Sequence, residues 1–487
     1  MMSSNQSITE STDEPVANSK FLFIAINNPD DLKDHDTKRR ARSHAVKQAL
    51  ENNRKLRKES GGNFRVSSSK DYSRRLASNR MRSQPRVAIP LSPSVSTLDP
   101  FQTLAVDSSR LHALFSNYKA RQAAEPVFSV KNELVYHSFH TVFNAGLDDP
   151  ALLNAVMLTF AFAATEGGIN QECLRYQSKA ISCIRERMSS IDRATMTTTI
   201  GAILLLTGVE ARLGMQFQVQ IHMRAIKQVL DMCQTEGIYL TSGIKRAIFW
   251  QDLNSSFMTG STRIVDHTTF TELQWKRDSY SPSLFRLPPG FQVRSQVLTK
   301  EFVEILEDIH ALSCIRVFSG PSNCKPLAMA NINNHQASIQ SRLVGLVGHS
   351  PILECCKLAA YLCSSMLCCQ VWCALVIPTH VSLRLLRELQ QANDDPVWED
   401  HPELLLWLLY IGGAFTTTET VRSDYVVLLR LNTSSRLRGL YKSWQELLNI
   451  LKQFIWSDVA FTSDVKALWE EVTNQTGSNL NIKFPTC

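Results

Sequence analysis

Apolar residues recur at three- and four-residue spacing along most of the chain after residue 100, and this spacing places them on one face of an α-helix. The clearest runs lie at residues 152–164, 173–188, 199–214, 221–233, 302–315, 382–392, 403–415 and 444–456. No stretch alternates apolar and polar residues with comparable strength, and no unit repeats at a fixed period. The pattern predicts an all-α fold, with one large multi-helix domain over residues 101–487.

The pattern is different before residue 100. Residues 1–32 are mainly polar and acidic, except for one apolar run, FLFIAI, at residues 21–26. This run is typical of a short strand or of a segment that docks on the main body. Residues 33–100 contain a basic stretch followed by a linker rich in Ser, Arg and Pro. The two parts together predict a basic, largely disordered N-terminal arm.

The basic stretch itself predicts a helix over residues 36–58. Asp34 or Asp36 can cap its start, and the pair Gly61 and Gly62 can end it. Between them lie good helix formers without Pro or Gly. Small apolar side chains form only a narrow stripe, so this helix can rest on another surface but cannot anchor a core.

The positive charge of the chain is confined to this region. Residues 33–86 contain 17 Lys or Arg and five Asp or Glu, a net charge of +12. Residues 1–32 carry one Lys and five acidic residues, a net charge of −4, and the whole chain carries +7. Residues 87–487 are therefore close to neutral, at −1. A localised positive segment attracts phosphate polymers and anionic surfaces.

The candidate site residues are the basic side chains of this stretch. We expect them to bind nucleic acid or to direct nuclear import, and they are Lys38, Arg39, Arg40, Arg42, Lys47, Arg54, Lys55, Arg57 and Lys58. A merely solvated charged face is the alternative. A basic zipper would need heptad leucines after the basic part, and the two glycines interrupt that register. Any sequence specificity needs another source.

Other chemistry receives little support from the sequence. Phosphate-binding glycine loops, zinc-protease and serine-hydrolase motifs do not occur, so we expect no enzyme. Six of the 12 cysteines lie between residues 355 and 373, spread over about 27 Å of a single helix, too far apart to converge on one metal ion. We interpret them as core residues and expect no metal and no cofactor.

One uncharged stretch has the length of a membrane span, at residues 358–378. Because Ser and Gln dilute it and it is the only such stretch, we expect a buried helix and no membrane partner. The first 20 residues lack the layout of a secretory signal, so we expect an intracellular protein with reduced thiols.

The C-terminal half resembles a known family. LLLWLLYIGGAF (residues 404–415) resembles the W-x-x-x-x-G-G helix of the fungal-specific transcription factor domain, and Arg422 and Tyr425 follow at the family's spacing. Trp444, Trp456 and LWEEV (468–472) come next in the expected order. Upstream, IHMRAIKQVL with His222 and AIFWQDLNSSF with Trp250 and Asp252 resemble the family's central helices, and FLFIAI, RRARSHAVKQ and LDPF (98–101) match its N-terminal order.

The resemblance implies a nuclear regulator of fungal metabolic genes, often within a biosynthetic cluster, with an all-α body that mediates regulation and self-association. The expected partners are DNA, with or without sequence specificity, transcriptional partner proteins and a second copy of the chain. The family's N-terminal six-cysteine zinc cluster is missing, because the first cysteine is Cys173. Two alternatives stay open: a helical adapter that does not bind DNA, and an accessory protein of a biosynthetic pathway. Trp250, Asp252, Trp407 and Trp444 are expected to pack and join helices.

Overall fold

The computed structural model describes residues 106–117, 120, 148–189, 195–318, 326–346, 350–368 and 376–474. Within these ranges the chain forms 16 α-helices and four short 3-10 helices, and no strand. The all-α prediction is confirmed. The described residues all belong to one compact unit, which extends over Leu91–Cys487.

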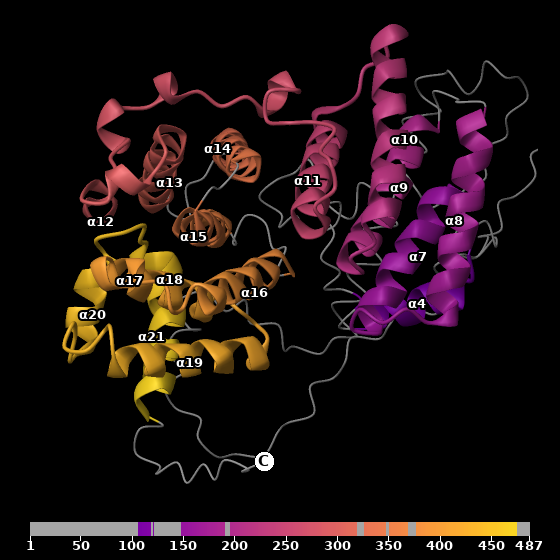
Figure 1. Ribbon diagram of the computed structural model, residues 1–487. Coiled ribbons are helices and arrows are strands. Elements are labelled where there is room, and N and C mark those ends of the chain that lie inside the picture. Colours follow the sequence, from indigo (N-terminus) through magenta and orange to yellow (C-terminus); the bar gives the residue numbers. More distant parts are fainter. Residues whose placement is uncertain are drawn as a thin grey trace, which may run out of the picture. The chain divides into compact units, whose positions relative to one another are not determined.

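The first group of helices surrounds one apolar cluster. Its members are α4 (Ser108–Ser116), α7 (Pro150–Ala164), α8 (Gln171–Ser189), α9 (Met196–Arg212), α10 (Gln216–Thr235) and α11 (Ser242–Thr259). Figure 1 shows α9 among the others, and it packs against α7, α8, α10 and α11. Its sequence explains this position, because apolar and small residues occupy nearly every place from 198 to 211 and all of these are buried.

A buried carboxylate joins three helices of this group. Asp149 caps α7 by accepting a hydrogen bond from the Leu152 amide at 3.0 Å. It also accepts hydrogen bonds from Arg187 of α8, at 2.8 Å, and from the hydroxyl of Thr198 of α9. Burial opposes ionisation, but these three donors lower the pKa of Asp149 below its ordinary value. A single ionised side chain thus fixes how α7, α8 and α9 meet.

The second group of helices surrounds another apolar cluster. Its members are α12 (Pro289–Gln292), α13 (Lys300–Phe318), α14 (Pro326–Gly345), α15 (Pro351–Leu367), α16 (Val376–Gln391), α17 (Val397–Asp400), α18 (Pro402–Ala414), α19 (Glu419–Ser434), α20 (Trp444–Leu451) and α21 (Asp458–Asn474). The central helix is α18, which packs against α15, α16, α17, α19, α20 and α21 (Figure 1). Residues 404–414 of α18 are all buried.

An extended segment connects α11 to α13. It contains η2 (Thr271–Leu273), η3 (Arg277–Ser279), η4 (Pro282–Leu284), α12 and η5 (Ser295–Val297). Part of it lies against α13 and α14, because η4 contacts α13 and η2 contacts α14. The segment therefore brings the residues that follow α11 to the surface of α14.

Two expected helices end earlier than their apolar runs suggested. The uncharged stretch at 358–378 is not one helix, since α15 ends at Leu367 and α16 begins at Val376. The run at 444–456 is helical only to Leu451 and then turns, with Trp456 held by a bond from its indole nitrogen to Asp458 at 2.9 Å. In the described ranges, none of the helices combines the length and apolar character that crossing a membrane requires.

Candidate functional site

The predicted basic residues lie outside the described part of the chain. This holds for Lys38, Arg39, Arg40, Arg42, Lys47, Arg54, Lys55, Arg57 and Lys58. The same is true of the apolar run at residues 21–26 and of the linker. The assignment of these residues to nucleic-acid contact or nuclear import stays a prediction.

The residues that carry the family resemblance in the C-terminal half join helices in the second group. Trp407 is fully buried, donates from its indole nitrogen to the Ile455 carbonyl at 3.2 Å, and stacks on Phe454 with ring centroids 5.4 Å apart. The Tyr425 hydroxyl donates to the Ser382 carbonyl of α16 at 2.8 Å. Trp444 is partly buried and lies 5.7 Å from Trp469 of α21, centroid to centroid. The expectation that Trp407 and Trp444 pack and join helices is confirmed.

The pair Gly412 and Gly413 allows α18 and α19 to approach closely. A Cβ atom on Gly412 would overlap the Tyr425 ring, at 2.5 Å from its Cζ atom. A Cβ atom on Gly413 would lie 2.9 Å from the Tyr425 Cβ atom. The Ser382 hydroxyl also donates to the Gly412 carbonyl at 2.6 Å. Glycine is thus required here by space, because the side chains of Tyr425 and Leu468 occupy the volume that another side chain would need.

Four cysteines of the group at 355–373 lie in the described ranges, and they behave as core residues. Cys355, Cys356, Cys363 and Cys368 are all buried. Burial raises the pKa of the Cys356 thiol to about 12 and raises the pKa values of Cys355 and Cys363 as well, so these thiols stay protonated. Cys369 and Cys373 lie outside the description. Groups of His, Cys, Asp and Glu suited to a metal ion do not occur among the residues that the structure describes.

The most unusual chemical feature of the body is a buried polar helix. From 332 to 341, ten consecutive residues of α14 are buried, and seven of them are polar. These seven, which we call the α14 polar layer, are Asn333, Asn334, His335, Gln336, Ser338, Gln340 and Ser341. Buried polar groups need hydrogen-bond partners, since desolvation costs about 1–3 kcal/mol for each group left without one. Their partners therefore define the site.

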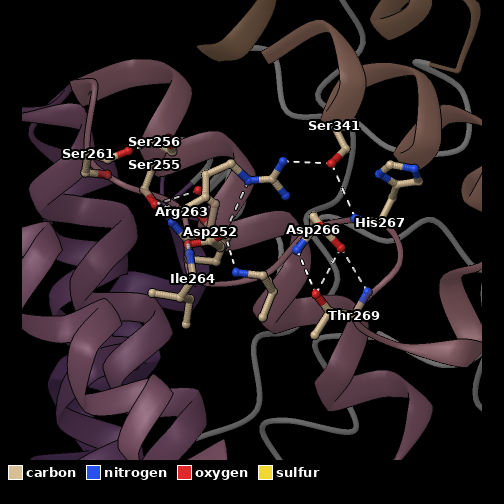
Figure 2. Close-up of polar contacts among 12 residues, drawn as sticks. Asp252, Ser255, Ser256, Ser261, Arg263, Ile264, Asp266, His267, Thr269 and Ser341 are labelled. Atoms are coloured by element: carbon tan, nitrogen blue, oxygen red, sulfur yellow. Dashed lines mark hydrogen bonds and ion pairs between the residues drawn. The ribbon is translucent and has the colours of Figure 1, made fainter. Parts of the chain in front are cut away.

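Asp252 of α11 organises one side of the polar layer (Figure 2). Its carboxylate accepts hydrogen bonds from the amides of Ile264, at 3.0 Å, and Val265, at 3.3 Å, and from Arg263 Nε at 3.3 Å. Burial raises the pKa of Asp252, whereas the amides and the guanidinium favour its ionised form. The arrangement ties the turn after α11 back onto that helix and holds Arg263 in place.

Arg263 then connects this turn to α14. Its Nη1 atom donates to the Ser341 hydroxyl at 2.7 Å. The backbone amide of His267 donates to the same hydroxyl oxygen at 3.3 Å, and both contacts are drawn in Figure 2. One serine of the polar layer thus receives two donors from the segment after α11. Burial and the nearby Arg342 and Arg263 lower the pKa of His267, so its ring is neutral near pH 7.

Other members of the layer contact α11, the connecting segment and α15. Asn333 Oδ1 accepts from Arg246 at 2.7 Å and from the Trp250 indole at 3.3 Å. Asn334 Nδ2 donates to the carbonyls of Glu272, at 3.0 Å, and Gln274, at 3.3 Å. Separately, the Gln340 amide nitrogen donates to two serine hydroxyls of α15. The polar layer is thus a joint between elements far apart in the sequence.

The charges beside the layer are balanced. Asp308 of α13 is fully buried and pairs with Arg277 at 2.7 Å and with Arg342. Arg277 also pairs with Glu307 at 3.0 Å. His335 lies next to these cations, and burial together with Arg342 and Arg277 lowers its pKa well below the ordinary value. The layer therefore presents neutral donors and acceptors, which suit an uncharged hydrogen-bonding molecule better than an ion.

The chain matches no known protein family, no curated protein and no solved structure in the comparisons made. The resemblance to the fungal-specific transcription factor domain rests on the quoted sequence features alone.

Proposed function

We propose that this protein is a nuclear regulator of transcription that contacts DNA through the basic stretch at residues 36–58. The observation that carries the proposal is the net charge of +12 over residues 33–86 in a chain that is otherwise close to neutral. Each Lys or Arg placed against a phosphate releases counterions, and six to ten such contacts give strong, salt-dependent binding. The nine basic side chains named above fall within that range.

The family resemblance supplies the biological setting of the proposal. It implies that the targets are fungal metabolic genes, in particular those of a secondary-metabolite cluster. It also implies that the all-α body mediates regulation, through partner proteins and self-association. The fold class of the described residues agrees with this role, because they form an all-α assembly with apolar clusters large enough to be stable.

A second candidate function is a nuclear adapter that reaches DNA through a partner factor. The lack of cysteine in residues 1–172 favours it, because this part of the chain does not supply the ligands of the zinc cluster that reads DNA in the family. In this case the sequence KRRAR at residues 38–42 acts as an import signal only. The two candidates predict different behaviour of the purified protein towards DNA.

The experiment is selection of bound duplexes from a random DNA library by the purified full-length chain at near-physiological salt, followed by salt titration of the bound DNA. An enriched motif, or binding that weakens steeply with salt, supports direct contact. The variant with Lys38, Arg39, Arg40 and Arg42 changed to Ala should lower the log–log salt slope by roughly 3–4. No binding by the wild type would overturn direct contact and leave the adapter function.

A matched control removes the same charge from the described body. Arg175, Lys179, Arg224 and Lys227 are exposed on α8 and α10. Their replacement by Ala should leave the salt slope unchanged. An equal loss of slope in both variants would contradict assignment of the contact to the basic stretch. Loss of nuclear accumulation in the first variant alone would support the import function.

A further inference from the structure

Several polar atoms beside the α14 polar layer have no hydrogen-bond partner among the described residues. They include both ring nitrogens of His335, the indole nitrogen of Trp275 and the Oδ1 atom of Asn334. All four atoms are buried, and the His335 side chain is 1% exposed. A buried polar atom without a partner is costly, so native proteins satisfy such groups with protein atoms or with bound molecules.

These atoms belong to one place in the fold. The rings of His335 and Trp275 are stacked, with centroids 3.7 Å apart and planes inclined by 7°. Asn334 precedes His335, and its amide nitrogen donates to the carbonyl of Gln274, the residue before Trp275. The two contacts of Asn334 Nδ2 with carbonyl oxygens fix the orientation of the amide. The other amide atom is therefore the oxygen Oδ1, which is a hydrogen-bond acceptor.

The hydrogen-bonding groups of His335, Trp275 and Asn334 favour an uncharged ligand. A neutral imidazole provides one donor and one acceptor, the indole nitrogen provides a donor, and Asn334 Oδ1 provides an acceptor. The four atoms thus offer two donors and two acceptors, with no net charge. The neighbouring Asp308 already pairs with Arg277 and Arg342, so no uncompensated charge calls for an ion. Water, which donates and accepts two hydrogen bonds, has the complementary pattern.

We propose that ordered water molecules bind at His335, Trp275 and Asn334 and connect α14 to the segment that follows α11. The two nitrogens of one imidazole ring point in opposite directions, so more than one water molecule is needed. The connection is then made partly through water, in contrast to the direct contacts from Arg263 to Ser341 and from Arg246 to Asn333.

The first test is a crystal structure of the full chain at a resolution that shows water. The expected result is density for water within hydrogen-bond distance of a His335 ring nitrogen and of Trp275 Nε1. Direct bonds from these nitrogens to protein atoms, or density for an organic molecule or an ion in contact with them, would overturn the proposal.

The second test is the sign of a change in thermal stability. His335→Phe keeps a ring on Trp275 and removes both nitrogens. If water is bound there, the variant removes the hydrogen bonds between the water molecules and the two ring nitrogens, and Tm should fall by about 2 °C or more. If the nitrogens have no partner at all, removing them relieves a penalty and Tm should rise, which would contradict the proposal. His380→Phe on α16 is the matched control and should leave Tm nearly unchanged, because no buried ring nitrogen without a partner occurs at that position.

Discussion

The helices α14 and α18 are both covered by the rest of the body, but they are held in different ways. The side chains of residues 404–414 of α18 are apolar apart from the hydroxyl of Tyr410 and the indole nitrogen of Trp407, and they contact six other helices. The buried residues of α14 between 332 and 341 are mostly polar, and some rely on partners far away in the chain, such as Arg246 for Asn333, 87 positions apart. Burial alone therefore does not tell how a helix is fixed.

The two helices differ in how much each contact depends on geometry. Dispersion and apolar burial at α18 are spread over many atoms and tolerate small shifts. Hydrogen bonds at α14 are directional, and a buried group that loses its partner is destabilising. We therefore expect α18 to be sensitive to changes of volume and α14 to changes of charge and polarity.

Gly412→Ala gives the largest expected effect. The added methyl group overlaps the Tyr425 ring, which is itself fully buried, so helices α18 and α19 must separate. We expect the free energy of unfolding to fall by about 3 kcal/mol, measured by chemical denaturation. Gly345→Ala at the end of α14 is the control, because no atom lies within 4 Å of its Cβ position. A similar loss in both variants would contradict the steric explanation.

Asp252→Asn tests the hydrogen bonds at one side of the α14 polar layer. The change leaves the Arg263 guanidinium without its buried counter-ion while preserving the shape of the side chain. We expect a loss of about 2 kcal/mol in the free energy of unfolding. Asp266→Asn in the same turn changes an exposed carboxylate and should cost less than 1 kcal/mol. Equal effects at the two positions would show that burial of the Asp252 pair does not matter.

The pH dependence of stability should reflect the neutral histidines. Burial lowers the pKa values of His267, His335 and His380 in the fold, whereas an unfolded histidine titrates near pH 6.5. The unfolded state then binds more protons, so stability falls as the pH decreases through about 6.5 and is retained above it. Each histidine contributes at most about 1.4 kcal/mol per pH unit. In a denaturation series from pH 7.5 to 5.5, His335→Phe should show a shallower slope, and an unchanged slope would contradict the assignment.

Tyr425→Phe gives the smallest expected effect. It removes the hydroxyl that donates to the Ser382 carbonyl but keeps the ring against the two glycines. We expect a loss of about 1 kcal/mol in the free energy of unfolding. A loss as large as that of Gly412→Ala would mean that the hydrogen bond from Tyr425 to α16, and not its close packing on the glycines of α18, holds α19 in place.

The apolar packing around α18 could be predicted from the sequence, because the residues that indicate it lie close together in the chain. Uninterrupted apolar runs marked α7, α9 and α18, and Trp407 was expected to pack and join helices. The limits of the C-terminal runs could not be foreseen in the same way. Residues 352–377 contain no Pro or Gly, so the end of α15 at Leu367 carries neither of these stop signals.

The local sequence gives little indication that the α14 polar layer is buried. The stretch INNHQASIQS lacks an apolar face of the usual width, so its periodicity is typical of an exposed or irregular segment. Its burial depends on Arg246, Arg263 and the carbonyl groups of residues 272 and 274, which lie far away in the chain. Only the three-dimensional structure brings these partners together. The polar composition of the stretch beside Ile332 and Ile339 is the one sequence feature that could have marked it.

Native-state hydrogen exchange of the full-length protein tests the contrast between the two helices most directly. Amide protons of α14, measured by mass spectrometry at neutral pH, should exchange through local openings of lower free energy than those of α18, because directional and water-mediated contacts are lost sooner than spread apolar contacts. Slower exchange in α14 than in α18, or identical exchange in both helices, would contradict the account.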